Sequence, residues 1–317
     1  MPLDPQTRKF LALLSASGNS SARRPSPEER RRAFSNLMQS LEGAPGPAGD
    51  SADVYVPASA GPLKIRIVTP PAARNSVSAG VLYFHGGGWV AGSIDTHEKI
   101  CARLAQASNC RIAIVEYRLA PEHKFPAALE DGIAALEWLS ANASRFAIDS
   151  SRFGVAGDSV GANIAAGVAR WASATGEHKL ALQALLCPIM DAVGDTESRR
   201  TFAQGYFLDQ ATLQDDLLHY CPPGLDYRDP RLSPVRAEDF SGLPAAHIHT
   251  AEFDPARDEA LSYADKLAAA GVPVEYTCHS GMIHLFIPCP DNILRNVGLA
   301  IGRALNEHNL ELGRARQ

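Results

Sequence analysis

The sequence has no excess of positive charge. Its 317 residues include 30 Lys and Arg against 35 Asp and Glu, which gives a formal net charge of −5 at pH 7. A surface that binds nucleic acid gathers Lys and Arg to neutralise phosphates, so this balance argues against a polyanion-binding protein. We therefore expect no nucleic-acid partner.

Long apolar segments and paired cysteines are also missing. A membrane-spanning helix needs about 20 apolar residues, and nothing in the chain approaches that length. The apolar stretch at residues 10–14 is too short for the core of a signal peptide, so we expect a cytoplasmic protein without stable membrane insertion. The cysteines form no CxxC pair, which predicts reduced thiols rather than disulfides or metal ligands. They are Cys101, Cys110, Cys187, Cys221, Cys278 and Cys289.

Two ligand-binding motifs are absent as well. The glycine-rich segment at residues 85–89 has no GxxxxGK pattern, which argues against a phosphate-binding loop. His97 and Glu98 lack the second histidine of an HExxH motif, which argues against a zinc protease.

What the chain does contain is a regular alternation of strands and helices. Residues 53–58 and 63–69 alternate like two antiparallel strands, and short apolar runs follow them. Helical segments lie between most of these runs, which predicts a mostly parallel sheet covered on both faces. The further strands are expected at residues 79–84, 111–117, 152–156, 182–187, 246–250 and 274–278, and the main helices at 96–108, 126–142, 160–174, 256–270 and 293–306.

Two segments stand outside this alternation. The first 45 residues predict two amphipathic helices, and the second starts with a capping box formed by Ser26 and Glu29. Arg30 and Arg31 belong to a basic run interleaved with acidic residues, which indicates a solvated helix face rather than a membrane- or anion-binding patch. Residues 191–221 break the strand–helix order and predict an insertion at the functional edge of the sheet.

A GxSxG pentapeptide, GDSVG, lies at residues 157–161 between a predicted strand and a predicted helix. This is the setting of a nucleophile elbow, in which the glycines permit a tight, strained turn that lifts Ser159 above the sheet. The amide dipoles of the following helix point at any negative charge that forms there. The alternative is a glycine-rich turn in which Ser159 only caps the helix.

The sequence HGGGW at residues 85–89 follows the strand expected at 79–84. Acyl transfer places a negative charge on the former carbonyl oxygen, and a loop of glycines can stabilise that charge with its backbone N–H groups. We expect Gly86 and Gly87 to supply two N–H groups and Val160, the residue after the nucleophile, to supply the third. His85 is expected to fix this loop by hydrogen bonding.

A serine hydroxyl is a poor nucleophile until a positioned base removes its proton. Asp254 and His284 each follow a predicted strand near the end of the chain, where active sites of open α/β sheets gather. We expect His284 to act as the general base and then acid, and Asp254 to orient it. Weaker rivals of the same residue types lie nearby. They are Asp258, His247, His249 and His279.

The combined motifs point to a known family. HGGGW, GDSVG, the pair Asp254-Pro255 and His284 carry the resemblance, together with the sequence YRLAPE at residues 117–122. From residue 53 onward the chain resembles the bacterial hormone-sensitive-lipase-like esterases, which are family IV carboxylesterases of the α/β-hydrolase superfamily. The order Ser, Asp, His along the chain is also that of the α/β-hydrolase fold.

The resemblance implies an α/β-hydrolase fold with a mostly parallel sheet of about eight strands, flanking helices and a helical cap. The cap is expected at residues 1–48 and 191–221, and the catalytic core at 49–190 and 222–317. The resemblance also implies hydrolysis of short- to medium-chain acyl esters, no cofactor or metal, and a homodimer.

Three positions depart from the pattern of the family. Val160 and Ala162 stand where the family usually has smaller residues, so the side chain of Val160 is expected to narrow the acyl site. Leu285 stands where glycine is common and affects the local loop. Tyr206 and Phe207 are expected to line the cap and contact the substrate.

The hypothesis from the sequence is an ester hydrolase that works through a covalent acyl-enzyme on Ser159 and takes a small-molecule ester as its partner. An amidase or peptidase stays open, because amines and alcohols leave from the same type of tetrahedral intermediate. A lipase of long triglycerides also stays open. A non-catalytic receptor for a small molecule is disfavoured because His284 is present.

Overall fold

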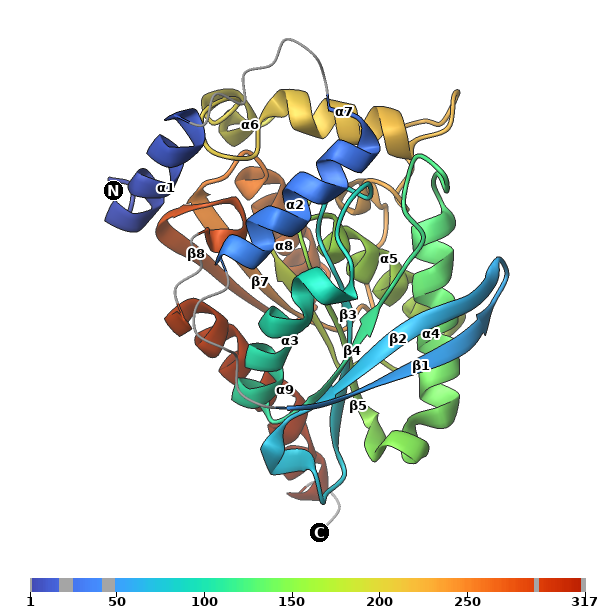
Figure 1. Cartoon of the computed structure of the whole chain (residues 1–317). Helices are drawn as coiled ribbons and strands as arrows, with labels where there is room; N and C mark the ends of the chain where they lie inside the picture. The colour runs from blue at the N-terminus through green and yellow to red at the C-terminus, as the bar shows by residue number, and fades with distance from the viewer. Residues whose placement is uncertain (1, 17–24, 42–48, 288–290, 315–317) are drawn as a thin grey trace.

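The computed structural model describes residues 2–16, 25–41, 49–287 and 291–314. Eight strands form one sheet in the order β1-β2-β4-β3-β5-β6-β7-β8 (Figure 1). β2 is antiparallel to both of its neighbours, and all other pairs are parallel, so the predicted mostly parallel sheet is confirmed. The strands are β1 (Asp50–Ala58), β2 (Gly61–Thr69), β3 (Ser78–Phe84), β4 (Arg111–Val115), β5 (Ile148–Asp158), β6 (Leu182–Leu186), β7 (Ala245–Phe253) and β8 (Val274–Ile283).

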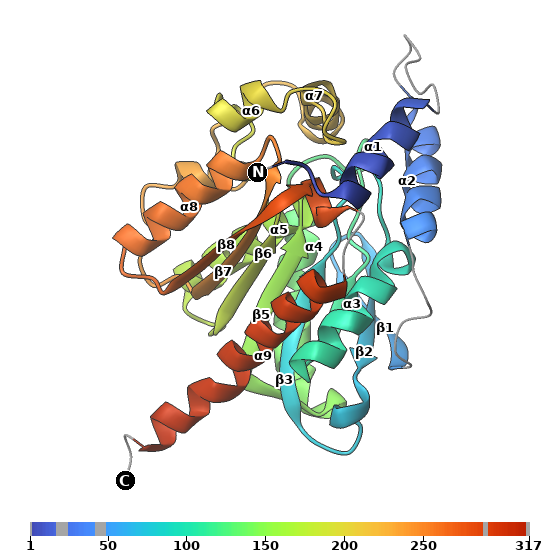
Figure 2. The same ribbon diagram turned by 90° about the vertical axis from the view of Figure 1, so that its left-hand side faces the viewer.

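Helices cover both faces of this sheet, as a parallel sheet requires (Figure 2). One face carries α3 (Ile94–Ser108) and α9 (Asp291–Arg314), and the other carries α4 (Ala127–Asn142), α5 (Val160–Thr175) and α8 (Arg257–Ala269). Each face has its own apolar core. Within the described ranges, no helix combines the length and the apolar character needed to cross a bilayer.

Burial along the strands follows their place in the sheet. Every residue of β3, β4 and β6 is buried, which explains why these strands appear in the sequence as continuous apolar runs. β1, at the edge, exposes most of its residues. The carboxyl ends of the buried parallel strands are therefore held in place by packing on both faces.

Four further helices lie together beyond the carboxyl ends of the parallel strands, and we call them the edge helices (Figures 1 and 2). They come from the two segments that stand outside the strand–helix alternation. The predicted capping box is confirmed, because the Ser26 N–H donates to Glu29 at 2.7 Å and the Glu29 N–H donates to Ser26 Oγ at 3.2 Å. The edge helices are α1 (Pro5–Ala16), α2 (Pro27–Leu41), α6 (Glu197–Thr201) and α7 (Gln210–Tyr220).

The packing of α5 on β3 depends on Gly161. A Cβ atom built at this position would overlap the carbonyl oxygen of Phe84, which is fixed in the sheet. We expect Gly161→Ala to lower the free energy of unfolding by about 1–3 kcal/mol, because α5 must move away from the strand. Urea denaturation measures this change. An unfolding free energy equal to that of the wild type would show that α5 can withdraw from β3 at no cost.

Candidate active site

Three residues predicted from the sequence meet at the carboxyl edge of the sheet. Ser159 lies between β5 and α5, Asp254 follows β7 and His284 follows β8. His284 Nε2 lies 2.9 Å from Ser159 Oγ, and His284 Nδ1 lies 2.7 Å from Asp254 Oδ2. The tautomer that satisfies both contacts carries its proton on Nδ1, which leaves Nε2 free to accept the serine proton. Such an arrangement can supply a nucleophile, a base and an acid that orients the base.

Ser159 sits on a strained turn between strand and helix. Its φ of 54° is rarely adopted by residues other than glycine. The Ser159 N–H donates to the carbonyl of Leu186 at 2.8 Å, and its carbonyl accepts from the Ile189 N–H at 3.3 Å. A Cβ atom at Gly157 would overlap the backbone of Gly161, so only glycine permits this tight turn. The strained conformation expected of a nucleophile elbow is present, and its neighbours hold it in place.

Asp254 is a fully buried carboxylate with a hydrogen bond to each oxygen. Oδ1 accepts from the Ala256 N–H at 2.9 Å, and Oδ2 faces His284. A buried charge is costly unless it is hydrogen-bonded, so these contacts fix its orientation. The rival Asp258 instead accepts from the Ser198 N–H at 2.8 Å and holds α6 against α8.

The rival histidines form a separate group on β7 and β8. His279 Nε2 lies 3.3 Å from His249 Nδ1, and His247 Nε2 lies 3.5 Å from a carboxylate oxygen of Glu275. Burial lowers the pKa of His249 to about 3, so this imidazole stays neutral. In the part of the chain that the structure describes, none of the three is a hydrogen-bond partner of Ser159.

The glycine-rich loop after β3 approaches the nucleophile, but its first glycine does not fit the predicted role. The Gly86 N–H donates to Asp158 Oδ1 at 3.1 Å, so the prediction that Gly86 supplies an oxyanion donor is wrong. Gly87 and Gly88 have φ angles of 121° and 68°, and their N–H groups find no acceptor among the described residues. Val160 is the first residue of α5, where a helix leaves its N–H without an internal partner.

Asp158 is the centre of a buried polar network that fixes this loop. Besides the Gly86 N–H, its Oδ1 accepts from the Tyr83 hydroxyl at 2.8 Å, and its Oδ2 lies 3.4 Å from His97 Nε2. Burial acts to raise the pKa of Asp158, but the charge of His97 and these hydrogen bonds outweigh it and leave the pKa below its usual value. His85 Nδ1 contacts the Gly86 carbonyl at 2.8 Å, in line with its expected role in fixing the loop.

Arg31 of α2 attaches an edge helix to the glycine-rich loop. Its guanidinium donates to the carbonyls of Val90 at 2.8 Å and Ala120 at 3.0 Å, and it pairs with both oxygens of Glu122. Bidentate arginine–carboxylate pairs are geometrically specific. The predicted solvated role is therefore wrong for Arg31, whose partners belong to the catalytic side of the sheet.

Arg30 makes a second contact between the edge helices and the same loop. It forms an ion pair with Asp216 of α7, and this pair packs directly against Gly88, where a Cβ atom would overlap the Asp216 carboxylate. Burial raises the pKa of Asp216 to about 7, although the positive charge of Arg30 acts in the opposite direction. Arg30 is also not the solvated residue that the sequence predicts.

Tyr206 and Phe207 pack among aromatic side chains. The Tyr206 ring stacks on Phe253, which directly precedes Asp254, with ring centroids 5.7 Å apart. Phe207 meets Phe10 of α1 edge to face at 5.9 Å and so joins the two segments that form the edge helices. Contact of Tyr206 and Phe207 with a substrate stays a prediction.

An apolar cavity of about 70 Å³ lies between α2, α3 and the residues that follow His284, and its lining includes Asp158 and Leu285, which are next to Ser159 and His284 in the chain. Leu285 and Phe286 have φ angles of 62° and 59°, which are uncommon for residues with a Cβ atom. Leu285 therefore adopts a conformation that glycine would take freely, and its side chain becomes part of the cavity wall. The lining residues are Met38, Leu41, Tyr83, Thr96, Lys99, Ile100, Arg103, Asp158, Leu186, Leu285, Phe286, Ile287 and Leu294.

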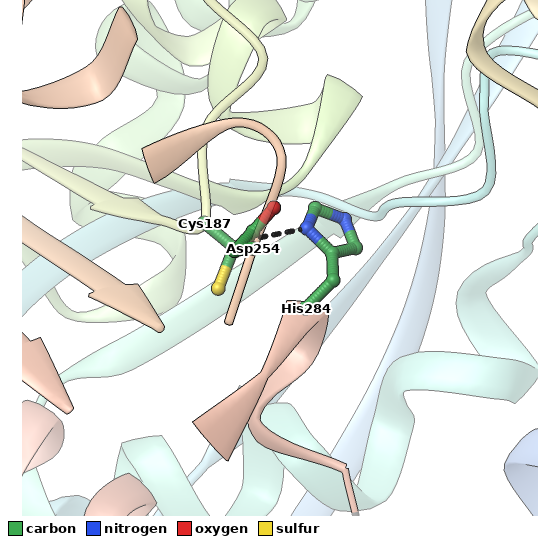
Figure 3. A group of neighbouring side chains, drawn as sticks. All are labelled: Cys187, Asp254 and His284. Atoms are coloured by element: carbon green, nitrogen blue, oxygen red, sulfur yellow. Dashed lines mark hydrogen bonds and ion pairs between the residues drawn. The ribbon is translucent and has the colours of Figure 1, made fainter. Parts of the chain in front are cut away.

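Cys187 joins Asp254 and His284 in the one group of potential metal-binding side chains found among the residues described (Figure 3). One ligand atom from each residue lies within 4.8 Å of the others. Asp254 and His284 hydrogen-bond to each other at 2.7 Å, which fits a catalytic pair better than two ligands of a common ion. We therefore interpret Asp254 and His284 as partners of Ser159, and Cys187 as a side chain that lies next to them.

Known proteins are similar to the chain throughout its length. The family described as alpha/beta hydrolase fold matches residues 81–288. Carboxylesterase NlhH of Mycobacterium tuberculosis is 39% identical over 229 residues, which is 71% of each chain. An arylesterase of Saccharolobus solfataricus is 33% identical over 309 residues, which is 97% of this chain and 99% of the relative. The chain belongs to the hormone-sensitive-lipase-like esterases of the α/β-hydrolase superfamily.

Solved structures of esterases share the whole architecture. A thermostable esterase from Pseudomonas putida ECU1011 superposes with a TM-score of 0.91 at 32% identity, covering 96% of this chain and 98% of that one. The α/β hydrolase LAE6 from the metagenome of Lake Arreo gives a TM-score of 0.88 at 36% identity, and the match covers 98% of this chain and 99% of that one. The protein is accordingly a carboxylic-ester hydrolase of this esterase family.

Several residues that shape this site could not be identified from the sequence. Gly88 could have been considered from its place in the triple glycine, but the choice between Gly86 and Gly88 depends on the side chain of Asp158. Asp216 and Arg30 are far apart in the chain, and no motif connects them. Cys187 appears in the sequence only as one scattered thiol.

We expect Asp158→Asn to lower kcat by about tenfold and to change KM by less than about twofold. The amide oxygen can still accept from the Gly86 N–H and the Tyr83 hydroxyl, but the variant loses the negative charge and puts an NH2 donor where Oδ2 faces His97, so the contacts that fix the glycine-rich loop become weaker. Steady-state kinetics with a soluble ester measure both constants, and Asp265→Asn on the exposed surface of α8 is the control. A folded Asp158→Asn variant with wild-type kcat would contradict this role.

Proposed function

We propose that the protein hydrolyses uncharged esters of short- to medium-chain carboxylic acids through an acyl-enzyme on Ser159. One observation carries the proposal above all, the hydrogen-bond chain from Ser159 Oγ through His284 to Asp254, with distances of 2.9 Å and 2.7 Å. In such a chain the base is already in contact with the hydroxyl that it must deprotonate.

The first half of the reaction forms the acyl-enzyme. Ser159 Oγ bonds to the ester carbonyl carbon while His284 Nε2 accepts the hydroxyl proton. The carbonyl oxygen becomes negatively charged, and the N–H groups of Gly87, Gly88 and Val160 are the proposed donors to it. His284 then gives its proton to the alcohol oxygen as the carbon–oxygen bond of the ester breaks.

The second half releases the acid. A water molecule bonds to the acyl carbon while His284 accepts one of its protons. The second tetrahedral intermediate then expels Ser159 Oγ, which regains a proton from His284, and the carboxylic acid leaves. Asp254 stabilises the protonated imidazole in both halves and keeps its own negative charge.

We assign the edge helices to a cap over this site, formed by residues 1–48 and 191–221, with the catalytic core at 49–190 and 222–317. The contact between Phe10 and Phe207 and the ion pair between Arg30 and Asp216 support this assignment, because each joins the two cap segments. We place the acyl chain in the apolar cavity lined by Asp158 and Leu285, the chain neighbours of Ser159 and His284. Its small volume of about 70 Å³ and apolar walls favour short to medium uncharged chains.

The first test is the hydrolysis of p-nitrophenyl esters from acetate to palmitate. We expect kcat/KM to peak at short or medium chains, and Ser159→Ala to lower it by at least about 10⁴-fold. Ser151→Ala, which alters an exposed serine, is the control. Near wild-type rates with Ser159→Ala would refute the nucleophile, and activity on anilides alone would favour an amidase.

The second test fills the proposed acyl cavity. Ile100→Trp places a larger side chain in its wall, so we expect kcat/KM for the hexanoate ester to fall by about tenfold relative to the acetate ester. Leu299→Trp, at an exposed position of α9 away from the cavity, is the matched control. An unchanged ratio between the two esters would place the acyl chain elsewhere.

A further inference from the structure

The segment that follows β6 contacts several parts of the triad. The carbonyl of Leu186 accepts from the Ser159 N–H at 2.8 Å, and the Ile189 N–H donates to the Ser159 carbonyl at 3.3 Å. Between them, Cys187 donates its own N–H to the carbonyl of His249 at 2.7 Å. Cys187 is therefore tied to β7 on one side and lies next to the nucleophile elbow on the other.

The side chain of Cys187 lies beside Asp254 and His284. Its sulfur, a carboxylate oxygen of Asp254 and a ring nitrogen of His284 lie within 4.8 Å of one another (Figure 3). The side chain is fully buried, and the φ angle of 45° is uncommon for any residue other than glycine. Such a conformation persists only where the surroundings enforce it. The fold thus holds this buried thiol next to Asp254 and His284 on a strained backbone.

The thiol keeps its proton in this position. Burial raises the pKa of Cys187 well above its usual value, and the negative charge of Asp254 raises it further, against a smaller effect of the Leu285 N–H. A protonated thiol is a weak hydrogen-bond donor and a weak acceptor. An oxygen of the Asp254 carboxylate lies within 4.8 Å of the sulfur, and Leu285 is also a neighbour; these two residues lie on the loops that carry Asp254 and His284.

We propose that Cys187 is a positioning residue, whose thiol holds the Asp254 carboxylate in line with His284 and limits how strongly that carboxylate stabilises the protonated imidazole. The inference rests on the proposed roles of Ser159, Asp254 and His284. Asp254 has one backbone donor on Oδ1, from Ala256, and His284 on Oδ2. An ionised carboxylate has room for about four hydrogen bonds, so the thiol adds a contact without displacing either.

Removal of the thiol should shift the pH dependence of kcat/KM in one direction. A donor next to a carboxylate neutralises part of its charge, so without the thiol Asp254 stabilises the protonated form of His284 more strongly. The pH midpoint of the rising limb of kcat/KM then moves to higher pH. The carboxylate also becomes less well oriented, which lowers kcat. A purely structural thiol would change stability and leave the pH profile in place.

The test compares two variants at this position with a buried thiol elsewhere. We expect Cys187→Ala to lower kcat by about tenfold, to leave KM within about twofold, and to raise the pH midpoint by about half a unit. Cys187→Ser keeps a short donor, so we expect kcat within about threefold of the wild type and an unchanged midpoint. Cys110→Ala, which removes a buried thiol at the opposite end of the sheet, should keep both values.

A folded Cys187→Ala variant with the kcat and pH midpoint of the wild type would overturn the proposal. So would equal losses in the alanine and serine variants, because the serine hydroxyl should replace the donor. If Cys187→Ala does not fold, Cys187→Ser decides: a wild-type midpoint with nearly full kcat supports the role, and a loss greater than about tenfold refutes it. Failure of the proposed function would look different, since the wild type itself would then show no ester hydrolysis that depends on Ser159.

Discussion

The hydrogen bond between Asp254 and His284 is the interaction on which the rest of the site depends. Both groups are buried, so the carboxylate would be strongly destabilised without its partners, and the imidazole would have no fixed orientation. The pair exists because the sheet brings its two halves together. Phe253 and Ile283, which directly precede Asp254 and His284, are register partners of β7 and β8. The register of two strands therefore sets the geometry of the acid and the base.

Strand register also positions Ser159 and the loops around it. Phe84 at the end of β3 is paired with Gly157 at the end of β5, so the glycine-rich loop and the nucleophile elbow leave the sheet side by side. Asp158 pairs with Leu186, and Leu186 pairs with His249. One row of strand ends thus carries the glycine-rich loop, Ser159 and the segment of Cys187 toward Asp254 and His284. The helices on both faces hold this row in place.

The fold and the three residues that meet at the carboxyl edge of the sheet could be predicted from the sequence because they depend on local patterns. Continuous apolar runs identify the strands that are buried on both faces, and Ser159, Asp254 and His284 each directly follow a strand that the sequence predicts. The role of Gly86 could not be predicted, because it depends on which N–H the side chain of Asp158 accepts from.

Contacts between distant segments could not be predicted from the sequence either. The partners of Arg30 and Arg31 lie on α7, on the glycine-rich loop and near residue 120, so a basic run on one helix gives no sign of them. Leu285 shows a further limit. The departure from glycine is visible in the sequence, but the chain keeps the positive φ angle and accepts the strain, and only the structure shows that its side chain then forms part of the cavity wall.

The most direct measurement of the central claim is covalent trapping of the nucleophile with a p-nitrophenyl phosphonate, followed by peptide mapping by mass spectrometry. A phosphonate places a tetrahedral, negatively charged group on an activated serine, where the histidine and the backbone donors have already been arranged to receive it. The account predicts one phosphonyl group per chain, located on the peptide that contains Ser159, and none in the Ser159→Ala variant. Labelling of a different residue, or loss of activity with Ser159 unmodified, would contradict it.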